Sequence, residues 1–219
     1  MNSFSFSSKL SKSFSVFYSN LAFTVLAVLV LASCVSNKIP AEYTENQQGG
    51  REIRPISRSL TDKGTRTQAE LAAFFMQNNP GANRDEVARL AGLYIKEASA
   101  EGINYDCAFA QMCHETGFLT FGNLVTPEMH NYCGLGAIDP EHPGEFFETE
   151  EIGVRAHIQH LQAYAYPEGT PLNNELVDNR YKWVKKGRAP TIFELAGTWA
   201  ADKEYGEKLD KLLSRLERF

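Results

Sequence analysis

Apolar side chains recur every three to four positions in several segments of the chain, which is the spacing of helices with one buried face. The first segment follows Thr67-x-x-Glu70, a capping-box pattern that satisfies free amides at a helix start. Asn83 precedes the second segment and Gly102 follows it, as expected for a helix cap at each end. The predicted helices cover residues 68–79, 84–101, 106–115, 152–164, 191–199 and 205–216.

No segment of comparable length has the alternating pattern of a β-strand. Residues 118–149 lack a helical period and contain seven glycine and proline residues. Long irregular segments in compact domains are usually functional. The pattern therefore predicts a mainly α-helical single domain, with a small glycine-rich lobe that can hold a β-hairpin.

The N-terminal residues have the pattern of an export signal. Residues 1–20 contain two lysines and no acid, and residues 21–31 are apolar except for Thr24, a run too short to span a bilayer. The next residues, Leu31-Ala32-Ser33-Cys34, resemble a bacterial lipobox, in which the cysteine becomes the lipidated first residue. The alternative is an ordinary signal peptide with an incidental cysteine.

We expect a lipoprotein signal peptide over 1–33, a lipidated Cys34 with a flexible linker over 34–59, and the folded domain over 60–219. This organisation implies a protein anchored to the membrane by lipid and facing the periplasm. Val35 follows the cysteine in place of an acidic residue, and the resemblance to lipoprotein sorting signals then implies the outer membrane of a Gram-negative bacterium.

Composition narrows the class of protein further. The chain has 219 residues, of which 43% are hydrophobic and 22% charged, so it can bury one core and is neither disordered nor collagenous. Its formal net charge of -5 gives no basic field for a nucleic acid, and we expect no such partner.

Metal sites find little support in the sequence. His114-Glu115 resembles the start of a zinc-protease motif, but that motif needs a second histidine at position 118, where this chain has Phe118. Cys107, Cys113 and Cys133 also match no common zinc spacing, even together with His114. We expect no metal and no cofactor. Cys113 and Cys133 either form a disulfide or are buried as small apolar residues, and three cysteines leave at least one unpaired.

Glu115 is the strongest candidate for chemistry. It ends an apolar predicted helix beside the glycine-rich segment. Burial at such a place raises the pKa of a carboxyl group, and a carboxylic acid that stays protonated near neutral pH can donate a proton to a glycosidic oxygen. A glutamate at a helix end is also commonly a solvated surface residue, so spacing alone leaves both readings open.

Five segments together resemble the glucosaminidase family of bacterial cell-wall hydrolases, whose endo-β-N-acetylglucosaminidase domain has a lysozyme-like fold. They occur in family order and are FAQMCHETGFLTFGN at 109–123, NYCGLGA at 131–137, FFETEEIGVRAHIQHLQAYA at 146–165, DNRY at 178–181 and LAGTWAADKEYGEKLDKLL at 195–213. The resemblance covers residues 67–219. It implies that Glu115 is the catalytic general acid and that Tyr205 lies near the sugar.

The resemblance also implies a substrate-binding set. Asn131 and Gly134 match the pattern that shapes the cleft floor, and the other expected members are Gln111, Phe118 and Tyr132. Aromatic faces of this kind can pack on sugar rings. Trp199, in contrast, is expected to pack in the core.

A second carboxylate is less clearly marked. Glu151 matches the position at which some family members carry another acid, and its alternative role is to cap the helix that begins near residue 152. Glycosidases commonly use two carboxylates, but the acetamido group of N-acetylglucosamine can itself act as the nucleophile.

The expected activity is hydrolysis of β-1,4 bonds in peptidoglycan after N-acetylglucosamine, by a monomer whose partners are glycan strands and the membrane that holds its anchor. One alternative is a muramidase or lytic transglycosylase on the same fold. The other is a lipoprotein that binds glycans without cleaving them.

Overall fold

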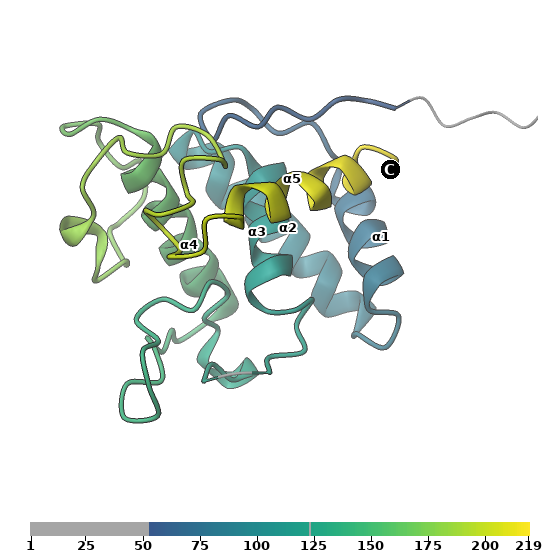
Figure 1. Cartoon of the computed structure of the whole chain (residues 1–219). Helices are drawn as coiled ribbons and strands as arrows, with labels where there is room; N and C mark the ends of the chain where they lie inside the picture. The colour runs from purple at the N-terminus through teal and green to yellow at the C-terminus, as the bar shows by residue number, and fades with distance from the viewer. Residues whose placement is uncertain (1–52, 123) are drawn as a thin grey trace, which may run out of the picture. The chain divides into compact units, whose positions relative to one another are not determined.

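The computed structural model describes residues 53–122 and 124–219. This part of the chain is mainly α-helical, as predicted (Figure 1). Its elements are α1 (Gln68–Asn78), α2 (Arg84–Glu101), α3 (Tyr105–Glu115), the 3-10 turn η1 (Pro127–Met129), α4 (Glu150–Ala165), the 3-10 turn η2 (Tyr181–Trp183) and α5 (Tyr205–Leu216). Helix α2 packs on α1, α3 and α4, and α5 packs on α3. This arrangement agrees with a lysozyme-like helical domain.

Side-chain caps place the helix starts close to where the sequence predicts them. Thr67 and Glu70 form the reciprocal capping box of α1, and the Asn83 side chain accepts the first amides of α2. Gly102 ends α2 with a left-handed backbone at φ 72°. Asn104 caps α3, which therefore begins one residue before the predicted start at 106.

Helix α3 is the centre of the core. Every side chain from Tyr105 to Cys113 is buried, so this helix is enclosed on all sides. Its last residue, Glu115, lines a hollow of the surface at the C-terminal end of the helix. The packing of α3 thus fixes the position of one carboxyl group at the edge of the core.

The prediction of a helix over 191–199 is wrong. Thr191 and Glu194 do hydrogen-bond as in a capping box, with the Thr191 amide 2.9 Å from Glu194 Oε2. The chain then turns, because Gly197 adopts a left-handed backbone at φ 77° and its amide donates to the Ala200 carbonyl at 2.7 Å. The segment is a tight loop, and it carries Trp199 toward the end of α3.

The glycine-rich lobe is built of turns. Among the described residues of the lobe, β-pairing consists of one isolated antiparallel bridge between Asp139 and His142. The Asn131 side chain holds the lobe together: its amide nitrogen donates to the carbonyls of Leu135 at 2.9 Å and Glu145 at 3.0 Å. Its oxygen accepts the Leu135 amide at 2.9 Å.

Residues 53–59, expected to be part of the linker, pack against the C-terminal part of the domain. Ile56 is buried, the Arg54 amide donates to the Glu217 carbonyl, and the Arg58 guanidinium pairs with Asp210 at 2.6 Å. The packed chain therefore begins before residue 60. The predicted signal peptide and Cys34 lie outside the described residues, and none of the described helices has the length and apolarity to cross a bilayer.

Candidate active site

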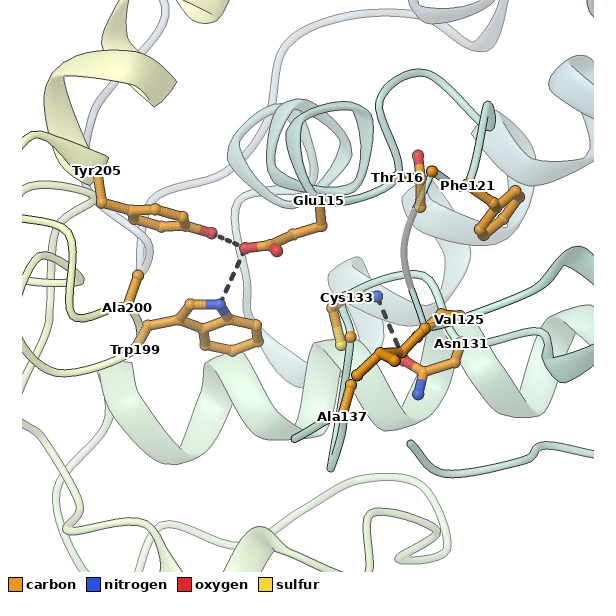
Figure 2. Close-up of a pocket in the computed structure, with 13 residues that line it drawn as sticks. Glu115, Thr116, Phe121, Val125, Asn131, Cys133, Ala137, Trp199, Ala200 and Tyr205 are labelled. Atoms are coloured by element: carbon orange, nitrogen blue, oxygen red, sulfur yellow. Dashed lines mark hydrogen bonds between the residues drawn. The ribbon is translucent and has the colours of Figure 1, made fainter. Parts of the chain in front are cut away.

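A cavity of about 340 Å³ opens at the C-terminal end of α3. Glu115 from α3, Phe121 and Gly134 from the lobe, Trp199 from the 196–200 loop and Tyr205 from α5 contribute to its walls. Figure 2 shows Trp199 and Tyr205 on one side of Glu115 and the lobe residues on the other. Segments distant in sequence thus meet around a single carboxyl group.

The two oxygens of Glu115 have different surroundings. Oε1 accepts a hydrogen bond from the Trp199 indole Nε1 at 3.1 Å and a second from the Tyr205 hydroxyl (Figure 2). Oε2 has no hydrogen-bond partner among the described residues. When the carboxyl group is protonated, its proton therefore belongs on Oε2, because Oε1 already faces two donors.

Burial raises the pKa of Glu115 above the usual range of a glutamic acid. The hydrogen bond from Tyr205, the charge of neighbouring His114 and the hydrogen bond from Trp199 act in the opposite direction without cancelling the effect of burial. A raised carboxyl pKa is the property that a general acid needs near neutral pH. The same donors stabilise the carboxylate that forms when the proton leaves.

Tyr205 is held by a buried chain of hydrogen bonds. Gln111 Nε2 donates to the Tyr205 hydroxyl at 2.8 Å, Gln111 Oε1 lies 3.1 Å from His157 Nε2, and His157 Nδ1 lies 2.8 Å from the Tyr94 hydroxyl. Burial lowers the pKa of His157 to about 3, so this imidazole is neutral and has one N–H.

The donor and the acceptor of each hydrogen bond in this series follow from the Gln111 amide and the neutral His157 imidazole. Since Gln111 uses its amide nitrogen on Tyr205, its oxygen accepts from His157 Nε2, and His157 Nδ1 accepts from Tyr94. In each hydrogen bond of this chain, the acceptor is therefore the partner nearer to Glu115 along the chain. The Tyr205 hydroxyl receives one hydrogen bond and can give its own proton only to Glu115 Oε1.

The predicted substrate-binding residues divide into two groups. Asn131 and Gly134 line the cavity. Gln111 is fully buried behind Tyr205, and Tyr132 is 3% exposed within the main core, so neither faces the cavity and the expectation for both is corrected.

Phe118 also turns away from the cavity, in contrast to its predicted role. Gly117, Phe118 and Leu119 all have left-handed backbones with φ between 56° and 60°, which ends α3 and reverses the chain. The Phe118 ring consequently packs at 5.4 Å from that of Phe75, in α1. The aromatic residue that this turn delivers to the cavity is Phe121.

Glu151 does not belong to the cavity. It lies in the first turn of α4, where it pairs with Lys96 at 2.7 Å and Arg155 at 3.1 Å. The hydrogen bond and charge of Lys96 lower its pKa. Among the described residues that line the cavity, Glu115 is the only carboxylic acid.

Trp199 is the site residue that sequence reasoning missed. Its ring does pack, at 5.6 Å from Tyr164 and 5.1 Å from His160, but its indole nitrogen reaches Glu115. Its place in the segment 195–213, which also contains Tyr205, is the signal that could have identified it.

The three cysteines of the domain are free and buried, so Cys113 and Cys133 do not form a disulfide. Burial raises the thiol pKa of both. Cys133 lines the cavity as a neutral, apolar surface. The described residues contain no cluster of three histidine, cysteine or acidic side chains arranged to hold a metal ion.

Comparison with known proteins agrees with this geometry. Residues 91–218 match the model of the Glucosaminidase family, described as mannosyl-glycoprotein endo-beta-N-acetylglucosaminidase. A protein of Borreliella burgdorferi described as uncharacterized is 37% identical over 196 residues, which cover 90% of this chain and 93% of the relative. No solved structure matches the chain.

Proposed function

The chain belongs to the Glucosaminidase family of glycoside hydrolases, and from this premise we propose that it hydrolyses β-1,4 bonds of peptidoglycan on the reducing side of N-acetylglucosamine. The single observation that carries the proposal is the environment of Glu115. This side chain is half-buried at a cavity, its pKa is raised, and its two donors leave Oε2 as the site of the acidic proton.

In the proposed first step, Glu115 Oε2 gives its proton to the glycosidic oxygen while the bond from that oxygen to the anomeric carbon breaks. Negative charge then develops on the carboxylate. Trp199 and Tyr205 stabilise this charge through hydrogen bonds that already exist in the free protein. Donors preorganised in this way lower the barrier because they need no reorientation as the charge forms.

The proposed nucleophile is the acetamido oxygen of the substrate. The described cavity residues offer no second carboxylate, and Glu151 is paired with Lys96 and Arg155 elsewhere. Attack by the acetamido oxygen on the anomeric carbon forms an oxazolinium ring. Water then opens this ring at the anomeric carbon and returns a proton to Glu115, which restores both the acetamido group and the acid.

The deciding experiment compares the parent protein with Glu115→Gln on purified sacculi carrying a dye label. We expect release by the parent and a loss of about 10²- to 10⁴-fold in the variant, because the amide cannot donate an acidic proton. Equal release by both proteins would remove Glu115 from the mechanism. No release by either protein would favour a lipoprotein that only binds glycans.

Mass spectrometry of the products identifies the bond. N-acetylglucosamine at the new reducing ends supports the proposal. Reducing N-acetylmuramic acid would identify a muramidase, and anhydro-muramic ends would identify a lytic transglycosylase.

We also propose that Cys34 is acylated and that the domain acts from the periplasmic face of the outer membrane. The apolar run at 21–31 and the following Leu31-Ala32-Ser33-Cys34 support this assignment. Growth with a labelled fatty acid tests it, and Cys34→Ser is expected to lose the label and to leave the membrane fraction. A Cys34→Ser protein that stays labelled would place the acyl group elsewhere.

A further inference from the structure

A strongly basic loop interrupts this acidic chain. The whole sequence has 27 acidic and 22 basic side chains, yet residues 180–188 contain five cations and no acid. These cations, with Trp183 in their midst, define the basic loop: Arg180, Lys182, Lys185, Lys186 and Arg188. None of the five makes an ion pair with a carboxylate among the described residues, so their charge is available to a ligand.

Trp183 is the centre of this surface. This residue is 66% exposed, so its ring is open to a ligand. The Arg180 guanidinium lies 5.1 Å and the Lys182 ammonium 6.0 Å from its ring centre. These cation–π contacts gather the charges around the ring without neutralising them.

The backbone of the basic loop is tied to the end of α4. The Gly187 amide donates to the Ala163 carbonyl at 3.2 Å, and the Ala189 amide donates to the Tyr164 carbonyl at 2.9 Å. The Tyr181 hydroxyl donates to Gln162 Oε1 at 2.7 Å. A surface held in this way loses little conformational entropy on binding, in contrast to scattered surface lysines.

A hollow of about 220 Å³ connects this loop to the neighbourhood of the active site. Trp183, Lys185 and Arg188 line one part of it, and Tyr164, Gly197 and Thr198 line the other. The next residue after Thr198 is Trp199, which lines the catalytic cavity. The Tyr164 and Trp199 rings are 5.6 Å apart, so two packed rings and one short loop separate the two hollows.

We propose that the basic loop binds the carboxylates of the acidic peptide branches carried by the glycan substrate. This inference rests on the proposed function, because it takes the branched, carboxylate-bearing polymer as the ligand. A polymer that occupies the cavity and continues past residues 197–198 meets Lys185 and Arg188 directly. An anionic membrane would also attract the cations, but a flat surface makes no use of the adjoining hollow.

The test uses full-length protein and soluble glycan strands whose peptide carboxylates are either free or chemically amidated. For Lys185→Gln/Arg188→Gln we expect KM on the free-acid strands to rise about three- to tenfold, as for the loss of two exposed ion pairs. On amidated strands this variant and the parent should have the same KM. The matched control, Lys63→Gln/Lys211→Gln, removes two exposed lysines elsewhere and should keep the parent's preference for free acids.

Two outcomes would overturn the inference. One is an equal KM for the loop variant and the control on free-acid strands. The other is selective loss of flotation with phosphatidylglycerol vesicles when the loop substitutions are added to Cys34→Ser, which lacks the proposed acyl anchor; this loss would assign the loop to lipid. If the parent cleaves neither kind of strand, the proposed function fails, and calorimetric titration of the same strands into Glu115→Gln, with and without the loop substitutions, still tests the basic loop.

Discussion

The indole nitrogen of Trp199 lies 3.1 Å from Oε1 of Glu115 and donates a hydrogen bond to it, although 84 residues separate the two side chains in sequence. The contact exists because the 196–200 loop turns at Gly197 instead of continuing as a helix. It favours the ionised carboxylate, whereas burial favours the neutral acid. The balance of these two effects sets the proton affinity of the proposed catalytic group.

Trp199→Phe removes this donor while keeping an aromatic ring. We expect kcat to fall about 10- to 100-fold, since a hydrogen bond to a charged group contributes about 1.5–3 kcal/mol. The pKa of Glu115 should rise, because a contact that favours the carboxylate is lost. The alkaline limb of kcat against pH therefore moves to higher pH. An alkaline limb at the parent's position would contradict this role, and Tyr166→Phe, outside the cavity, is the control.

Glu151→Gln tests whether a second carboxylate takes part. Because Glu151 pairs with Lys96 and Arg155 and does not line the cavity, we expect activity on labelled sacculi within about threefold of the parent. A loss approaching that of Glu115→Gln would return Glu151 to the mechanism. Lys96→Gln removes the other partner of this ion pair, and its activity should match that of Glu151→Gln if both residues act only at the surface.

Helix positions were largely predictable because they depend on local patterns. Thr67, Asn83 and Gly102 act through contacts with residues at most four positions away, and the structure places them at the predicted helix ends. The mainly helical fold and the place of Glu115 at the end of α3 follow from such signals. The family resemblance adds Tyr205, whose hydroxyl does reach Glu115.

The positions of Phe118 and Trp199 differ from the prediction because they depend on backbone geometry that hydrophobic periodicity does not encode. Phe118 follows a glycine in a predicted turn, and only the left-handed run at 117–119 shows that its ring returns to α1. Thr191 and Glu194 make the local hydrogen bonds of a capping box, but Gly197 prevents the helix that such a pattern normally starts. Trp199, expected to pack in the core, reaches Glu115 because the chain turns at Gly197.

Gly153 provides a stability test of how α4 meets the lobe. A Cβ at this position would lie 1.8 Å from the carbonyl oxygen of His130, which is backbone and cannot rotate away. Gly153→Ala should therefore lower the free energy of unfolding by about 3 kcal/mol, as overpacking does, although alanine normally stabilises a helix interior. Urea unfolding followed by circular dichroism measures the change.

Gly81→Ala is the matched control for Gly153. Its added Cβ would have its nearest neighbour at 3.6 Å, an ordinary contact. We expect a change within about 0.5 kcal/mol. If Gly153→Ala were as stable as this control, the close approach of α4 to His130 would be wrong.

His157 makes stability depend on pH. Burial lowers its pKa to about 3, whereas an unfolded histidine titrates near 6.5, so the unfolded state binds more protons between these values. The stability that His157 contributes is complete above pH 6.5 and is lost as pH falls through the window from 6.5 to 3. At pH 4.5, about two pH units below the unfolded pKa, the loss is about 3 kcal/mol, because each pH unit in the window corresponds to roughly 1.4 kcal/mol.

His157→Gln removes this titration and retains an amide that can hydrogen-bond to Gln111 or Tyr94. The variant should be less stable than the parent at pH 7, because glutamine fits the hydrogen-bond chain less well than histidine, and the difference should shrink by about 3 kcal/mol at pH 4.5. Urea unfolding at both pH values measures this, with His142→Gln, in the exposed Asp139–His142 turn, as the control. A constant difference between parent and His157→Gln would mean that folding does not lower the pKa of His157, so that the imidazole is protonated at pH 4.5 in the folded protein as well. A folded imidazolium would donate through both nitrogens, so its hydrogen bond with Tyr94 would reverse, whereas Nε2 would still donate to Gln111 and Tyr205 would remain a donor to Glu115.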